Sequence, residues 1–163
     1  YCTFNGLMVA AYLLHNTNKV GSGVKIGILD IDHHYGNGTD DIIEHFKMHD
    51  FIHHYTFGRD SSNYYWKGGK QAVEWLASLP GIVSGFKGCD VVIYQAGADP
   101  HVNDPLGGAL TSTQLRERDK VVFTGLKSLG IPVAWNLAGG YQTPIQKVLD
   151  IHNTTMEECL KLM

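Results

Sequence analysis

The sequence places two aspartates and two histidines within five consecutive positions, as Asp30, Asp32, His33 and His34. Carboxylate oxygens and imidazole nitrogens are ligands that divalent metal ions such as zinc accept. The two glycines that follow in the stretch 30–39, DIDHHYGNGT, allow the backbone to turn sharply after these side chains. The stretch would also serve as an ordinary polar loop, in which Asp and Asn make turns and caps. Composition alone leaves both interpretations open.

A second polar stretch, residues 97–108 with the sequence GADPHVNDPLGG, follows an apolar run. Asp99 comes directly after this run, where an unpaired buried carboxylate would be costly and a nearby cation would compensate for it. Asp104 precedes Pro105, and we interpret it as a residue that stabilises a turn. A metal is therefore one explanation for Asp99, and a capped turn is the other.

A third stretch ends another apolar run with Gly139, Gly140 and Tyr141. The two glycines allow another segment to approach the backbone closely and place the tyrosine hydroxyl where the run ends. A tyrosine in this position packs more often than it catalyses. The stretch is therefore a weak functional signal by itself.

These three stretches follow segments whose patterns predict β-strands that alternate with helices. An α/β fold with a mainly parallel sheet is the expected class. The polar stretches then fall at the carboxyl ends of strands, the edge at which open α/β sheets bind ligands. We expect Asn5 to cap the first helix, charged residues to line one side of the helix 112–129, and the helix before Pro80 to end there. The predicted strands are 24–31, 51–57, 90–96 and 131–137, and the predicted helices are 7–14, 40–47, 70–79, 112–129, 144–149 and 154–162.

Length and composition indicate an ordinary globular domain that takes in residues 1–163. The chain has 44% hydrophobic and 18% charged residues, with a formal net charge of −3. This charge does not indicate a nucleic-acid-binding protein, and no apolar run is long enough for a membrane span. Three widely separated cysteines argue against a disulfide framework. We therefore expect a cytoplasmic protein, or a nuclear one if the source is eukaryotic, with no nucleic-acid or membrane partner.

Taken together and in this order, the motifs resemble the histone deacetylase and acetylpolyamine amidohydrolase family of zinc-dependent deacylases. The similarity lies in the strings 30–39, 97–108 and 138–141, and in residues 1–5, YCTFN, which are similar to a Phe-Cys-x-x-Asn segment of the family. The elements Asn-Gly-Thr and Asp-Pro-Leu-Gly are closer to the class II and bacterial branches. The resemblance implies a partial arginase/deacetylase-like fold with three layers, in which a mainly parallel sheet is flanked by helices.

The resemblance also implies roles for individual residues. Asp32, His34 and Asp99 match the zinc ligands, and Tyr141 matches the tyrosine whose hydroxyl stabilises the oxyanion. Asp30 matches an aspartate that supports a catalytic histidine and contributes to a potassium site, near Asp32 and His34. His33 stands where the family has an apolar residue, and it remains an alternative ligand.

The implied reaction is removal of an acyl group, such as acetyl, from a lysine side chain or a polyamine. The substrates would be acyl-lysine peptides or acetylpolyamines, and the protein could form homo-oligomers. Tyr1, Gly139 and Gly140 match residues that line the substrate tunnel.

The sequence differs from the family in the residues that would act as the catalytic base. The family has an adjacent His-His pair shortly before the Phe-Cys segment, so we expect the chain to be part of a longer domain. His53-His54 lies after the zinc motif, on a predicted strand, and we interpret it as a strand and surface pair. A non-catalytic metal-binding or scaffold protein therefore remains the alternative. Arginase-like hydrolysis of guanidino groups is disfavoured, because Gly-Gly-Tyr is typical of deacylases.

Overall fold

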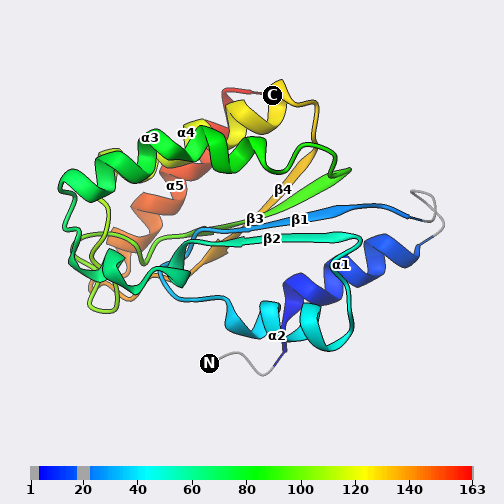
Figure 1. The fold of residues 1–163 in the computed structure, drawn as a ribbon. Helices are drawn as coiled ribbons and strands as arrows, with labels where there is room; N and C mark the ends of the chain where they lie inside the picture. Colours follow the sequence, from blue (N-terminus) through cyan, green and yellow to red (C-terminus); the bar gives the residue numbers. More distant parts are fainter. Residues whose placement is uncertain (1–3, 18–22, 163) are drawn as a thin grey trace.

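Four parallel strands form the central sheet of the computed structural model, which describes residues 4–17 and 23–162 (Figure 1). The strands lie side by side in the order β2-β1-β3-β4. Because all pairs are parallel, the carboxyl ends of the strands lie at one edge of the sheet. Their bounds are β1 (Ile26–Asp30), β2 (Ile52–Thr56), β3 (Val91–Gly97) and β4 (Val133–Ala138).

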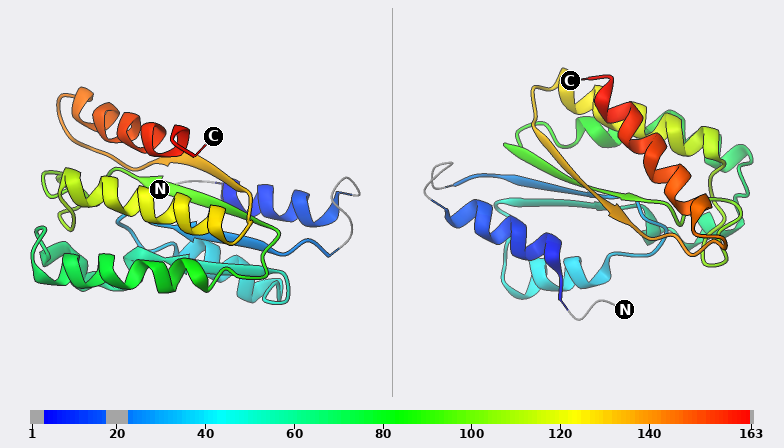
Figure 2. Two further views of the ribbon diagram at one scale, coloured as in Figure 1. Left: turned by 90° about the horizontal axis from the view of Figure 1, so that it is seen from above. Right: turned by 180° about the vertical axis from the view of Figure 1, so that it is seen from behind.

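Helices cover both faces of this sheet, so the structure has three layers (Figures 1 and 2). One face packs against α1 (Gly6–Asn16) and α2 (Asn37–His45). The other face packs against α3 (Lys70–Ser84), α4 (Ser112–Ser128) and α5 (Gln146–Leu160). Every residue of β1 is buried, as expected for a strand covered on both sides. The expected α/β class and three-layer arrangement are confirmed.

The apolar runs of the sequence become strands that separate two hydrophobic clusters. Ile26 and Ile28 point from β1 into the cluster under α1 and α2, whereas Leu29 points into the larger cluster under α3, α4 and α5. Asn5 caps α1 as expected, because its side-chain oxygen accepts a hydrogen bond of 3.0 Å from the backbone nitrogen of Met8. All four predicted strands are present, with ends shifted by one or two residues.

Several predicted helix bounds are wrong. The helix expected to stop before Pro80 continues through it to Ser84, α2 begins three residues before the expected position, and a single helix, α5, replaces the two helices expected over 144–149 and 154–162. In α3, Leu79 and Val83 lie on the buried side, so packing on both sides of Pro80 outweighs the hydrogen bond that proline cannot donate. In α5, the polar residues between the two predicted helices do not interrupt the helix. Burial of the face that contains residues 151, 152 and 155 outweighs their weaker tendency to form a helix.

The expected one-sided charge pattern of α4 is also incorrect. Arg118 and Asp119 are buried, with exposed fractions of 0% and 1%. They face the sheet, whereas Arg116 and Lys120 of the same helix are exposed. Thr111 and Gln114 begin the helix with a reciprocal capping box. In the described part of the chain, no helix is long and apolar enough to cross a membrane.

Two short 3-10 turns, Phe57–Arg59 and Ser61–Tyr65, connect β2 to α3. The first of them passes beneath the loop that follows β1. A Cβ on Gly58 would lie 2.1 Å from the carbonyl carbon of His34, so only a glycine allows this approach. The turn therefore supports the backbone of the loop that contains the candidate ligands.

Candidate metal centre

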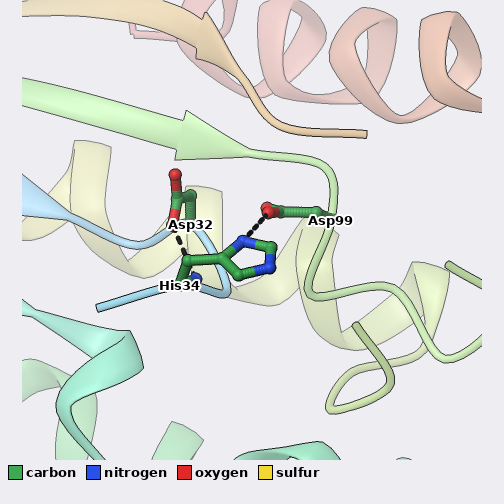
Figure 3. Close-up of side chains that lie close together, drawn as sticks. All are labelled: Asp32, His34 and Asp99. Atoms are coloured by element: carbon green, nitrogen blue, oxygen red, sulfur yellow. Dashed lines mark hydrogen bonds and ion pairs between the residues drawn. The ribbon is translucent and has the colours of Figure 1, made fainter. Parts of the chain in front are cut away.

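Asp32, His34 and Asp99 converge at the carboxyl edge of the sheet (Figure 3). One possible ligand atom from each residue lies within 4.8 Å of the others. The pairing of β1 with β3 ends at Asp30 and Gln95, so the loops that follow these two strands begin next to each other. This arrangement explains how residues 65 and more positions apart in the sequence reach one site.

Hydrogen bonds fix the mutual orientation of the three side chains. His34 Nδ1 lies 2.9 Å from Asp99 Oδ2, and the backbone nitrogen of His34 donates to Asp32 Oδ1 over 2.7 Å. The backbone nitrogen of His33 donates to Asp99 Oδ1 over 3.1 Å. Asp99 is fully buried, whereas the side chain of His34 is 41% exposed. The group is therefore anchored in the interior and accessible from one side.

The glycines after β4 allow the chain to pass over the carboxylate of Asp99. Gly139 has a φ of +55°, and a Cβ there would lie 2.3 Å from the carboxyl carbon of Asp99. Gly140 has a φ of +106°, and a Cβ there would lie 2.5 Å from Val148 Cγ1. Both positions require glycine for its backbone conformation and for space. The close approach expected from the sequence is therefore present, and its target is a candidate ligand.

Three carboxyl groups lie close together at this edge of the sheet, so the ionisation of each is disfavoured by its neighbours. Burial, followed by the charge of Asp32, raises the pKa of Asp30 to about 8. Burial and the charge of Asp99 raise the pKa of Asp32 to about 6. The hydrogen bond to Asp99 raises the pKa of His34. A divalent cation would neutralise such a cluster, and two carboxylates with one imidazole are a donor set that fits a divalent metal.

The structure distinguishes between the two neighbouring histidines. His33 is not part of the converging group and is fully buried, with its ring 4.1 Å from that of Tyr64. Neither ring nitrogen of His33 has a hydrogen-bond partner in the described part of the chain. Burial lowers its pKa to about 4. His34, rather than His33, is therefore the histidine placed beside Asp99.

Two residues of the centre are absent from the sequence-based predictions. Gln95 donates from Nε2 to Asp30 Oδ1 over 3.0 Å and to Asp32 Oδ2 over 3.2 Å. Arg118 donates from Nη1 to the backbone oxygens that precede the ligand loops. Gln95 had a recognisable signal, as a polar residue within an apolar strand. Arg118 had none, because it lies in a run of alternating charges.

Tyr141 lies beside His34, one of the three candidate ligands. Its ring is 6.3 Å from the ring of His34, and the residue is 50% exposed. The backbone nitrogen of Tyr141 donates to Asp104 Oδ2 over 2.7 Å, while Asp104 Oδ1 accepts from Leu106. Asp104 therefore stabilises its own turn, as expected, and also fixes the tyrosine loop. Tyr1 lies outside the described residues.

The pair His53-His54 lies in β2, and neither residue belongs to the group formed by Asp32, His34 and Asp99. The ring of His53 packs at 4.6 Å from that of Phe86. His54 Nδ1 is 2.8 Å from Asp40 Oδ1, and the side chain of His54 is only 3% exposed. The strand position is confirmed, whereas the interpretation of His54 as a surface residue is wrong because α2 covers it.

Comparison with known proteins points to one family. The model of the histone deacetylase domain matches residues 1–74. An uncharacterised protein of Picosynechococcus sp. is 30% identical over 173 residues, covering 94% of this chain and 54% of that protein. Histone deacetylase 18 of Arabidopsis thaliana is 33% identical over 135 residues, covering 66% of this chain and 20% of that protein. The chain thus spans about half the length of the first relative and a fifth of the second.

Two crystal structures share the fold. A histone deacetylase homologue in complex with SAHA has a TM-score of 0.62 and 18% identity, covering 99% of this chain and 50% of that one. The HD domain of HDA15 has a TM-score of 0.58 and 21% identity, covering 96% and 56%. The resemblance to the histone deacetylase family is therefore confirmed, and the chain has the arginase/deacetylase-like α/β fold.

Proposed function

We propose that this chain forms the metal-binding part of a zinc-dependent hydrolase that removes acyl groups from lysine side chains or polyamines. The convergence of Asp32, His34 and Asp99 within 4.8 Å is the observation that carries the proposal. The match to the histone deacetylase domain supports the class of reaction. The SAHA complex of the structural neighbour supports an acyl-lysine peptide as one substrate class, with acetylpolyamines as the other.

Zinc is the metal proposed for this centre. Catalytic zinc sites use three protein ligands and leave a position open, and two aspartates with one histidine would provide such a set of O and N ligands. One zinc ion there would supply Lewis-acid polarisation of an amide carbonyl and activation of a water molecule. Asp32 and Asp99 would bind as carboxylates and His34 as a neutral imidazole, so binding would release protons.

Tyr141 is proposed to stabilise the oxyanion by donating its phenolic hydrogen. Its half-exposed position beside His34 supports this role, as does the hydrogen bond from its backbone to Asp104. The removal of one such donor typically lowers turnover by about 10²–10³-fold. Gly139 and Gly140 are proposed to line the substrate tunnel together with Tyr1.

Asp30 is proposed to hold the loop that contains Asp32 and His34 in place through hydrogen bonds. It is buried, and its Oδ1 accepts hydrogen bonds from the backbone nitrogen of Asp32 and from Gln95. These contacts fix the start of the ligand loop. A potassium ion near Asp30, Asp32 and His34 remains a prediction.

A metal-binding scaffold without catalytic activity is the second candidate. His53 and His54 contact Phe86 and Asp40, and neither belongs to the group of converging ligand atoms, which favours this candidate. General acid–base catalysis contributes about 10²–10⁴-fold to a rate, and in the described part of the chain His34 is the one histidine in the converging group.

Metal analysis together with hydrolysis assays distinguishes the two candidates. The purified protein would be loaded with zinc, dialysed, analysed for metal and then incubated with an acetyl-lysine fluorogenic peptide and with an acetylated polyamine. The hydrolase predicts about one zinc per chain and hydrolysis that a chelator abolishes. Zinc binding without hydrolysis of either substrate would favour the scaffold. Absence of bound zinc would contradict both candidates.

A further inference from the structure

Arg118 of α4 is a cation buried completely beneath the candidate metal centre, with no exposed surface. Burial of a guanidinium group is costly unless its charge and its donors are compensated. Its Nε donates to Asp119 Oδ1 over 2.8 Å, which compensates for the charge. Its Nη2 is buried without a hydrogen-bond partner in residues 4–17 and 23–162. The ion pair with Asp119 alone therefore does not account for an arginine at this position.

The remaining nitrogen of Arg118 joins the two strands that lead to the ligands. Nη1 donates to the backbone oxygen of Ile31 over 3.2 Å and to that of Gly97 over 2.7 Å. Ile31 directly precedes Asp32, and Gly97 lies two positions before Asp99. One guanidinium group therefore connects β1 and β3 just beyond the point where their ladder ends.

The counter-ion of Arg118 is itself held rigidly. Asp119 Oδ1 accepts a hydrogen bond from the hydroxyl of Tyr94, and Asp119 Oδ2 accepts one from the hydroxyl of Thr155 over 2.6 Å. Burial raises the pKa of Tyr94 well above its usual value, so the phenol stays protonated and continues to donate. The guanidinium group is therefore oriented by residues of β3, α4 and α5.

We propose that Arg118 is a positioning residue that sets the spacing of the two strand ends from which Asp32 and Asp99 extend. Figure 3 shows these two side chains reaching the centre from neighbouring strand ends, with His34 between them. A change in the separation of the strand ends would change the distance between the two carboxylates. This inference rests on the proposed function, because the effect that it predicts is a change in the affinity of the centre for zinc.

Lysine cannot replace arginine in this role. Its ammonium group is a compact point charge, whereas the planar guanidinium group directs several donors at fixed angles. Arg118→Lys therefore keeps the charge but loses the simultaneous contacts with Asp119 and the two backbone oxygens. Arg116→Lys is a matched control, because Arg116 lies on the same helix with a 44% exposed side chain and forms ion pairs with Glu157 and Glu158.

A double variant addresses the case in which Arg118→Lys does not fold. Arg118→Met with Asp119→Asn removes both buried charges together, which avoids leaving an unpaired charge in the core. Substitutions of residues that orient metal ligands typically lower metal affinity by about 10- to 100-fold. We expect a loss of this size in Arg118→Lys and in the double variant, measured by competition with a zinc chelator, and no loss in Arg116→Lys.

Amide hydrogen exchange of the zinc-free protein tests the same inference without the metal. We expect faster exchange in segments 29–35 and 95–101 of Arg118→Lys than in Arg116→Lys. Wild-type zinc affinity in a folded Arg118 variant, or unchanged exchange in these segments, would overturn the positioning role. If the wild-type protein binds no zinc, the proposed function fails, while hydrogen exchange still decides the role of Arg118.

Discussion

Substitution of Gly139 by alanine would test whether the loop after β4 shapes the metal centre. The added Cβ would lie 2.3 Å from the carboxyl carbon of Asp99, far inside van der Waals contact. Because Asp99 is fully buried and lies beside His34, its carboxylate has little space to move without breaking that contact. We therefore expect Gly139→Ala to displace either the loop or the ligand.

The free-energy cost of Gly139→Ala has two parts, and a control substitution at a second glycine distinguishes between them. Gly139 has a φ of +55°, and an alanine in the left-handed region costs about 1–2 kcal/mol. Gly130, at the end of α4, has a φ of +70° but nothing within 4 Å of a Cβ. Gly130→Ala therefore has the backbone cost alone, whereas Gly139→Ala has that cost and the clash with Asp99.

The assay combines thermal unfolding with zinc competition for both variants. For a chain of this size, 1 kcal/mol shifts the melting temperature by about 2–4 °C. We expect both variants to melt lower than the wild type, with zinc affinity reduced at least about 10-fold in Gly139→Ala only. Wild-type zinc affinity in folded Gly139→Ala, or an equal loss in both variants, would refute the reasoning.

Three further predictions concern single side chains. His34→Ala should lower the zinc content strongly, whereas His53→Ala should not, because only His34 lies beside the carboxylates; equal metal content in both variants would contradict the ligand assignment. Tyr141→Phe should keep zinc bound while lowering turnover by about 10²–10³-fold, and a parallel loss of both would contradict a role in oxyanion stabilisation. Burial lowers the pKa of His33 to about 4, so the unfolded chain binds a proton between pH 6.5 and 4 that the folded chain does not. The free energy of unfolding should therefore decrease as the pH is lowered from 6.5 to 4, and it should decrease less in His33→Phe; equal slopes in chemical denaturation would count against burial as the cause.

Much of the fold follows from local patterns of the sequence. The apolar run that includes Ile26 and Ile28 can be stable only when both of its faces are covered, which predicts a central parallel strand. The helix boundaries were less predictable. Pro80 has a strong local tendency to end a helix, but burial of Leu79 and Val83 on one face of α3 opposes it, and the sequence does not reveal that burial.

The candidate ligands were predictable because their residue types and spacing carry chemical information. Asp32 and His34 follow one predicted strand, and Asp99 follows another, so a parallel sheet brings them to the same edge. The choice between His33 and His34 depended on the resemblance, because neighbouring residues differ only in which way they point. Arg118 could not be predicted, since an arginine among alternating charges has the pattern of an exposed helix face.

The central claim is that Asp32, His34 and Asp99 bind one zinc ion. A crystal structure of the zinc-loaded protein, with anomalous data recorded at the zinc absorption edge, tests it most directly. We predict a single strong anomalous peak about 2.0–2.2 Å from one nitrogen of His34 and from carboxylate oxygens of both aspartates. A zinc-loaded crystal with no peak between these three side chains, or with the ion held by other residues, would contradict the claim.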